Sequence, residues 1–277
     1  MNVPTTDYLE LQQLAVDAAQ VAGNLLTEMQ STIKAVEKAP KDLVTEADVA
    51  SQTEIFQRIG SARGEDWFLG EEHLTQSGLM GDRIVDASAD LTQLEYCWVV
   101  DPLDGTINYV HQLPGYCVSI AVLRYGQPVA AAVFDPVLGD CYSAASGLGA
   151  YRNGQPLSAS RCDKISESLV AASFSAGVTR GSAEVERWVE MLYQCQSLRR
   201  MGSAALNLCY VSQGSLDAYW ATSVKIWDIA AGILMVREAG GTVTAMDSSE
   251  LDLIKPQLIA AGNGNLHNQI VSVFEHL

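Results

Sequence analysis

The chain has 277 residues, of which 48% are hydrophobic, and its 33 acidic and 17 basic residues give a formal charge of −16. It can bury a large core, but its acidity disfavours nucleic acid and membrane partners, and no stretch approaches the ~20 apolar residues of a membrane helix. The first thirty residues lack the basic start and apolar core of a signal peptide, so we expect a cytoplasmic protein. The six cysteines lack disulfide or metal spacing, and we expect reduced core thiols.

Two helices are predicted at the start of the chain. Apolar residues recur at helical spacing over residues 7–29. A proline-bearing loop from Lys38 then runs into a second helix, which Thr45 caps and which continues to about residue 58. Asp48 falls in the first turn of this helix, where an acidic side chain ordinarily complements the helix dipole.

A short buried strand is predicted next, over residues 66–69. Gly70 then allows a sharp turn that aims Glu71 away from water, although Gly-Glu-Glu is also common at the end of a solvated loop. Residues 75–93 are polar and lack periodicity. They predict a long surface loop that could cover the site.

Residues 98–108 gather two carboxylates and a helix start. An apolar run typical of a buried strand ends at Asp101, a proline sets a turn, and Asp104 precedes Gly105-Thr106, which can open a helix. A divalent cation could bind here through Asp101, Asp104 and a main-chain carbonyl. The N–H groups of Gly105 and Thr106 would then face an anion. Asp-Pro-x-Asp-Gly is equally a good turn, so the stretch alone leaves both interpretations open.

Consecutive strands with short connections predict an antiparallel sheet in the middle of the chain; they span residues 116–125, 128–134 and 140–145. Residues 147–154 look like a dinucleotide-binding fingerprint. However, Arg152 stands in place of the third glycine and no helix pattern follows, so we predict a hairpin. The polar connection over residues 156–168 is the best domain boundary, between an α+β half (1–155) and an α/β half (156–277).

The second half alternates strands and helices, which indicates an α/β arrangement. The predicted strands span residues 169–174, 216–220, 241–246 and 258–261. The predicted helices span residues 183–194, 203–211 and 229–238, and a last helix ends near Phe274. Asp228 lies immediately before or at the start of a helix, where by itself an aspartate is more often an N-cap than a metal ligand.

The absence of several well-known catalytic motifs restricts the reactions that the chain could catalyse. The chain has no G-x-S-x-G, G-x-x-x-x-G-K-[ST] or H-E-x-x-H motif, and covalent catalysis therefore has no strong candidate. What remains is a set of acids at the ends of apolar runs or the starts of helices: Asp48, Glu71, Asp101, Asp104 and Asp228. Oxygen ligands favour magnesium over zinc, and paired magnesium ions can drive water attack on a phosphate. Bound cations would also reverse the repulsion between this acidic chain and a phosphate ester.

Four motifs together resemble the inositol monophosphatase family. They are Asp42-Leu43-Val44-Thr45-Glu46-Ala47-Asp48, Gly70-Glu71-Glu72, Asp101-Pro102-Leu103-Asp104-Gly105-Thr106-Ile107-Asn108, and Trp227-Asp228-Ile229-Ala230-Ala231-Gly232 followed by Glu238-Ala239-Gly240-Gly241. The motifs occur in the family's order and cover almost the whole chain. The resemblance implies a layered αβαβα sandwich, like that of fructose-1,6-bisphosphatase, with the site between two halves. It also implies lithium sensitivity and a homodimer.

The resemblance further implies where two or three magnesium ions bind. Glu71, Asp101 and the carbonyl of Leu103 would hold the first ion, and Asp101, Asp104 and Asp228 the second. Glu71 would also share a third, weaker ion. Thr106, hydrogen-bonded towards Asp48, would orient the attacking water. The N–H groups of Gly105 and Thr106 would hold phosphate oxygens, and Asp228 would lie near the leaving oxygen.

Substrate contacts depart from the family pattern. Gly202, Ser203 and Ala204 belong to a segment that resembles the one meeting the sugar-like ring in the family. The glutamate that binds inositol hydroxyls in the animal-type enzymes falls on Ala221, which cannot accept a hydrogen bond through its side chain. Lys225 is either an attractor for a second anionic group on the substrate or a solvated surface lysine.

The sequence therefore predicts a magnesium-dependent phosphomonoesterase for inositol 1-phosphate or a similar small polyol phosphate. Alternatives of the same chemistry are a bisphosphate nucleotidase, a fructose bisphosphatase and a histidinol phosphatase. An alternative of another class is a weakly active relative that serves as a binding or regulatory module through its acidic surface.

Overall fold

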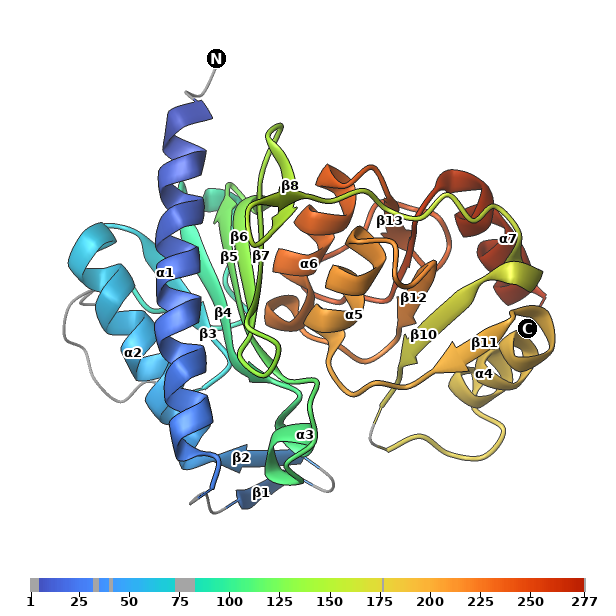
Figure 1. Ribbon diagram of the computed structural model, residues 1–277, viewed down its shortest axis with the longest axis horizontal. Coiled ribbons are helices and arrows are strands. Elements are labelled where there is room, and N and C mark those ends of the chain that lie inside the picture. Colours follow the sequence, from blue (N-terminus) through green and yellow to red (C-terminus); the bar gives the residue numbers. More distant parts are fainter. Residues whose placement is uncertain (1–4, 32–34, 40–41, 73–82, 176, 277) are drawn as a thin grey trace.

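The computed structural model describes residues 5–31, 35–39, 42–72, 83–175 and 177–276 and stacks their helices and sheets in five layers (Figure 1). Helices α1 and α2 form one outer layer, α5 and α6 lie between two sheets, and α4 and α7 form the other outer layer. The helices are α1 (Thr5–Met29), α2 (Glu46–Arg63), α3 (Thr106–Val110), α4 (Ala183–Gln194), α5 (Ala204–Ser212), α6 (Ile226–Glu238) and α7 (Gly264–Glu275). The αβαβα sandwich implied by the resemblance is confirmed.

The first sheet has seven strands in the order β3-β4-β5-β6-β7-β8-β9. They are β3 (Trp67–Gly70), β4 (Cys97–Asp104), β5 (Cys117–Arg124), β6 (Gln127–Asp135), β7 (Asp140–Ala145), β8 (Gly149–Arg152) and β9 (Gln155–Pro156). The β3–β4 pair is parallel and every other pair is antiparallel. The predicted antiparallel sheet and the hairpin near residues 147–154 are confirmed.

The second sheet has five strands in the order β11-β10-β12-β14-β13. They are β10 (Leu169–Ser173), β11 (Ser197–Arg199), β12 (Ala218–Ala221), β13 (Thr242–Ala245) and β14 (Leu258–Ala261). Strands β11, β10 and β12 run parallel, whereas β14 and β13 are antiparallel to their neighbours. The division at residues 155 and 156 stays a prediction, because α5 and α6 pack against both sheets.

Two predicted loops are more ordered than expected. The loop from Lys38 belongs to a hairpin of β1 (Ala35–Ala39) and β2 (Asp42–Thr45), and α2 runs to Arg63 instead of 58. Of the predicted 75–93 loop, residues 75–82 lie outside the described residues. Residues 83–85 pair beside β3, where Phe68 N–H donates to Arg83 O and Val85 N–H donates to Phe68 O. An edge strand offers such backbone groups to a neighbouring segment, so this part extends the sheet.

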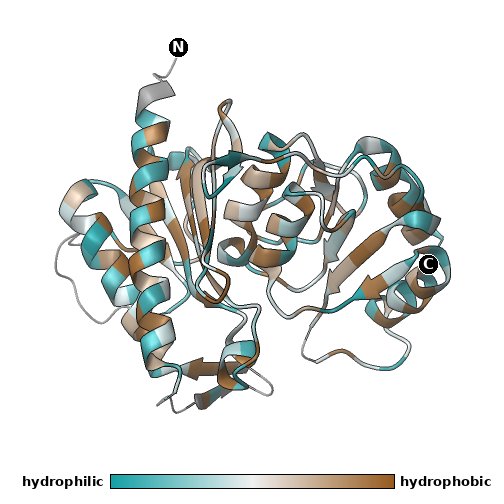
Figure 2. Cartoon of the chain, in the orientation of Figure 1, coloured by the Kyte–Doolittle hydropathy of each residue, from teal (hydrophilic) through white to brown (hydrophobic). Residues whose placement is uncertain are grey.

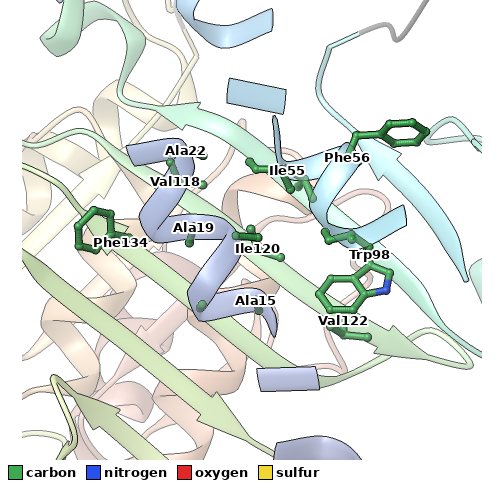
Figure 3. Close-up of a cluster of buried hydrophobic side chains, with 14 of the residues drawn as sticks. Ala15, Ala19, Ala22, Ile55, Phe56, Trp98, Val118, Ile120, Val122 and Phe134 are labelled. Carbon is green, nitrogen blue, oxygen red and sulfur yellow. The ribbon is translucent and has the colours of Figure 1, made fainter. Parts of the chain in front are cut away.

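Four apolar cores fill the spaces between the five layers. Alternate residues of one strand serve two cores: in β5, Val118 and Ile120 face α1, whereas Ala121 joins the core shared with α5 and α6. Figure 3 shows the small α1 residues Ala15, Ala19 and Ala22 beside Val118, Ile120 and Phe134. In Figure 2 the sheet strands are largely apolar, while helices carry polar bands towards water. None of the described helices could span a membrane.

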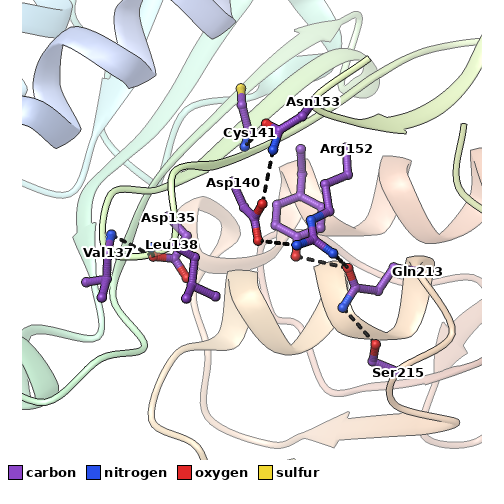
Figure 4. Close-up of polar contacts among 10 residues, drawn as sticks. Asp135, Val137, Leu138, Asp140, Cys141, Arg152, Asn153, Gln213 and Ser215 are labelled. Atoms are coloured by element: carbon purple, nitrogen blue, oxygen red, sulfur yellow. Dashed lines mark hydrogen bonds and ion pairs between the residues drawn. The ribbon is translucent and has the colours of Figure 1, made fainter. Parts of the chain in front are cut away.

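Polar contacts join the first sheet to the middle helical layer (Figure 4). Arg152 on β8 pairs with the buried carboxylate of Asp140 at 2.7 Å. Arg152 and the hydroxyl of Tyr142 both donate to Gln213 Oε1, at 3.3 and 3.1 Å. Gln213 caps the end of α5, so the end of the middle layer is fixed to the sheet.

Close packing inside the middle layer makes Gly232 sensitive to substitution. A Cβ at Gly232 of α6 would lie 2.4 Å from Leu208 Cβ of α5. We expect Gly232→Ala to lower the free energy of unfolding by about 1–3 kcal/mol, because overpacking outweighs the gain in helix propensity. Urea unfolding checks this. Gly177→Ala, where a Cβ meets nothing within 4 Å, is the control. A Gly232→Ala protein as stable as the wild type would contradict the packing argument.

Candidate active site

The centre of the site is the corner where β4 passes into α3. The pairing of β4 with β5 is interrupted between Asp101 and Asp104, and both carboxyls are buried. Gly105 follows with φ 91°, and a Cβ there would lie 2.7 Å from Gly115 O. Only glycine fits both constraints. The predicted turn and helix start are therefore confirmed.

Each of these aspartates is held by backbone N–H groups. Asp101 Oδ1 accepts from Leu103 N–H at 3.0 Å. Asp104 Oδ2 accepts from the Ser203 hydroxyl at 2.5 Å and from Ala205 N–H at 2.7 Å. Ser203 is the N-cap of α5, so Asp104 lies at the start of that helix. The predicted substrate residue Ser203 is thus buried beneath the site, where it positions Asp104.

Glu71 and Asp228 approach the corner from two other elements. Gly70 is paired with Val100 in the parallel β3–β4 register, and Glu71 N–H donates to Val100 O at 3.1 Å. Asp228 lies in the first turn of α6, where it accepts from Lys225 N–H at 2.7 Å. The N-cap interpretation of Asp228 is wrong. The helix begins at Ile226, earlier than predicted, which makes Lys225 the N-cap.

Burial and mutual repulsion govern the ionisation of these acids. Burial raises the pKa of Asp101 well above its usual value, and the charges of Glu71, Asp104 and Asp228 raise it further. Burial also raises the pKa of Asp104, and it raises that of Asp228 to about 8 together with the charge of Asp104. Burial and mutual repulsion disfavour the ionised form of these carboxyls, and a bound cation would stabilise that form. Among the described residues, no three acidic, histidine or cysteine side chains are already gathered in a metal-binding geometry.

Asp48 and Thr106 do not share a hydrogen bond. Asp48 is buried in the first turn of α2, and Thr45 donates to its Oδ2 through both the backbone N–H, at 2.8 Å, and the hydroxyl, at 2.6 Å. The Thr106 hydroxyl donates instead to Leu103 O at 3.0 Å. The expected Thr106–Asp48 contact is wrong because Asp48 closes the capping box of α2.

Two buried polar residues of α2 were missed by the sequence analysis. The Ser51 hydroxyl donates to Pro102 O at 2.8 Å, which joins α2 to β4. The Gln52 amide accepts from Glu72 N–H at 2.9 Å and donates to Glu72 O at 2.5 Å. It therefore fixes the backbone next to Glu71. The available signal was the spacing, since both residues follow Asp48 by about one helical turn.

A cavity of about 410 Å³ opens at the start of α3. Predicted site residues that line it are Asp104, Gly105, Thr106, Gly202, Ala204 and Asp228. Asn108 and Arg200, which belong to the two matched sequence segments, also line it, as do Ser173, Phe174 and Val224, which the sequence analysis did not assign to the site. Neither Ala221 nor Lys225 lines it. Ala221 is wholly buried in the core between β12 and the middle helices, because alternate β12 residues face that core, and Lys225 is exposed.

Comparison with known proteins agrees with this fold and shows the family. The family model described as "Inositol monophosphatase family" matches residues 7–277. Inositol monophosphatase 1 of Solanum lycopersicum is 36% identical over 96% of this chain and 95% of its own. The Nus factor SuhB of Xylella fastidiosa is 34% identical over 91% of this chain and 89% of its own.

Solved structures give the same result. An inositol monophosphatase from Anabaena (Nostoc) sp. PCC 7120 superposes with a TM-score of 0.83 at 32% identity, over 98% of this chain and 97% of its own. The extragenic suppressor protein suhB of Bartonella henselae superposes with a TM-score of 0.86 at 30% identity, over 96% of this chain and 98% of its own. The chain therefore belongs to the inositol monophosphatase family and is a phosphomonoesterase of that family.

Proposed function

We propose that this phosphomonoesterase uses magnesium to hydrolyse inositol 1-phosphate or a related small polyol phosphate by direct attack of water. The observation that carries the proposal is the set of acids at the β4–α3 corner, whose burial and mutual charge raise their pKa values beside an open cavity. Such a set is unfavourable alone and favourable around cations. No strong covalent nucleophile motif competes with this mechanism.

The chemistry of the donors suits two or three magnesium ions, around which these side chains would draw together. Glu71, Asp101 and the Leu103 carbonyl would hold the first ion, and Asp101, Asp104 and Asp228 the second. Glu71 would share a third, weaker ion. All donors are oxygens, as magnesium prefers. When bound, magnesium supplies positive charge that favours ionisation of the attacking water and stabilises the leaving oxygen.

The remaining roles belong to the chain itself. Gly105 and Thr106 line the cavity, where their N–H groups would hold phosphate oxygens. The Thr106 hydroxyl donates a hydrogen bond to Leu103 O, so its oxygen is free to accept a hydrogen bond from the attacking water and orient it. Asp48 acts as a positioning residue, since it fixes the start of α2, whose Ser51 is bonded to Pro102. Asp228 would lie near the leaving oxygen.

A substrate panel tests the proposal. Purified protein with Mg²⁺ should release phosphate from inositol 1-phosphate or another small polyol phosphate with the highest kcat/KM of the panel. The panel includes a 3′(2′),5′-bisphosphate nucleotide, fructose 1,6-bisphosphate and histidinol phosphate as competing substrates of the same chemistry. Absence of Mg²⁺-dependent release from every member would contradict the proposed function.

Gln52 provides a test of the magnesium site that leaves its ligands intact. We expect Gln52→Ala to raise the Mg²⁺ concentration for half-maximal activity about 10-fold, because groups that support metal ligands typically contribute this much to affinity. The physical reason is the loss of both hydrogen bonds to the Glu72 backbone. Magnesium titration of phosphate release measures the effect. Gln57→Ala, at an exposed position of the same helix, is the control. Identical Mg²⁺ curves for wild type and Gln52→Ala would refute it.

A binding role is the second candidate function. The similarity to the Nus factor SuhB of Xylella fastidiosa supports this candidate. The acidic surface would contact a basic partner. Co-purification of a stoichiometric partner, combined with negligible turnover on the whole panel, would support this role over catalysis.

We also propose that the chain forms a homodimer. Light scattering should then give twice the 29.8 kDa mass of the chain, and a monomer mass would refute it.

A further inference from the structure

An arginine side chain that packs over an aromatic ring lines the cavity. Arg200 is the only lysine or arginine among the described residues that line the cavity. Its guanidinium lies over the ring of Phe174, another lining residue, 4.6 Å from the ring centroid. Phe174 in turn packs edge-on against Trp188 of α4, with centroids 5.5 Å apart. The guanidinium therefore rests on a ring that α4 supports.

The backbone beside Arg200 is tied to the start of α3. The Asn108 side-chain amide of α3 donates to Met201 O at 2.9 Å and to Gly115 O at 2.8 Å. Gly202 has φ 93°, and a Cβ there would lie 2.8 Å from Asn108 Nδ2. The backbone that carries Arg200 is thus joined to the helix that begins after Gly105, where Gly105 and Thr106 are proposed to bind the scissile phosphate.

A guanidinium placed over an aromatic ring can still present N–H groups to other partners. These N–H groups match the paired oxygens of a phosphate or carboxylate. The other ionisable residues that line the cavity are the acids Asp104 and Asp228, which are proposed magnesium ligands.

On the basis of the proposed function, we propose that Arg200, supported by Phe174, binds a second anionic group on the alcohol part of the substrate. Between two otherwise similar phosphate monoesters, the site then favours the one that also carries a second phosphate or a carboxylate. This is the role that the sequence analysis considered for Lys225, which lies outside the cavity lining.

Matched substrate pairs test this inference. Fructose 1,6-bisphosphate is compared with fructose 1-phosphate, and 3-phosphoglycerate with glycerol 3-phosphate. Arg200→Ala should lower kcat/KM for the member with the second anion about 10-fold or more, mainly through KM, since a hydrogen-bonded charge pair is lost. The partner lacking that anion should change by less than about 3-fold. Arg200→Lys should fall between, because it keeps the charge and loses the planar edge.

The controls separate this inference from the proposed function. Arg161→Ala removes an exposed arginine outside the cavity lining and should leave both members of each pair unchanged. A selective loss on the fructose pair assigns a second phosphate, and a selective loss on the glycerol pair assigns a carboxylate. Equal losses on both members, or the same losses in Arg161→Ala, overturn the inference while the phosphatase remains. If the wild type with Mg²⁺ hydrolyses neither these esters nor inositol 1-phosphate, the proposed function fails first.

Discussion

Asp101→Asn should reduce kcat for phosphate release about 1,000-fold while leaving the protein folded. Asp101 is the carboxylate proposed to bridge two magnesium positions, and metal stabilisation of the transition state amounts to several kcal/mol. Asparagine keeps the size of the side chain and can still accept the hydrogen bond from Leu103 N–H. Phosphate release at saturating Mg²⁺ measures the loss, and circular dichroism confirms the fold.

Stability gives an independent control for this variant. In EDTA, Asp101→Asn should melt at the same or a higher temperature than the wild type, because it removes a buried acid that its neighbours repel. Asp163→Asn, at an exposed position, should change neither activity nor melting. An Asp101→Asn protein that keeps wild-type turnover would eliminate the proposed magnesium site.

The second large effect is the pH dependence of the melting temperature in the absence of divalent cations. Burial and the charge of Asp104 raise the folded-state pKa of Asp228 from the ordinary value of 3.8 for an aspartate to about 8. Between these values the folded state binds more protons than the unfolded state, so its stability decreases as the pH rises. We therefore expect Tm in EDTA to fall between about pH 4 and pH 8, and Mg²⁺ to reduce the fall by compensating the carboxylate charge.

Asp228→Asn isolates this contribution. In EDTA, the difference in Tm between the variant and the wild type should grow in favour of the variant as the pH rises through the same window. Thermal unfolding followed by circular dichroism at several pH values measures it. A wild-type protein that gains stability relative to Asp228→Asn from pH 4 to pH 8 would contradict the proposed electrostatics.

The helices and strands that were predicted correctly are those whose own residues show a clear helical or strand pattern. Helix α4 was predicted with its observed bounds, 183–194, and the three antiparallel strands were found from their apolar runs and turns. The β1–β2 hairpin was missed because its two short strands flank a lysine–proline stretch that reads as a loop. Strand β11 has three residues, too few for a period to emerge.

The acids of the site could be named from the sequence, but their hydrogen bonds could not. Asp228 looked like an N-cap because the actual N-cap of α6, Lys225, lacks the usual capping chemistry. Ala221 was counted into the substrate contacts from its spacing to Asp228, yet its strand directs it to the core. Phe174 and Arg200 follow different strands, so only the folded chain brings them together.

The middle helical layer has a consequence for how the molecule unfolds. Helices α5 and α6 supply apolar side chains to the cores beneath both sheets, and Gln213 anchors their layer to β8. Loss of either sheet would leave one side of this layer facing water, at a cost that grows with the apolar area exposed. The two sheets are therefore energetically coupled, and the chain is built to denature in one cooperative transition.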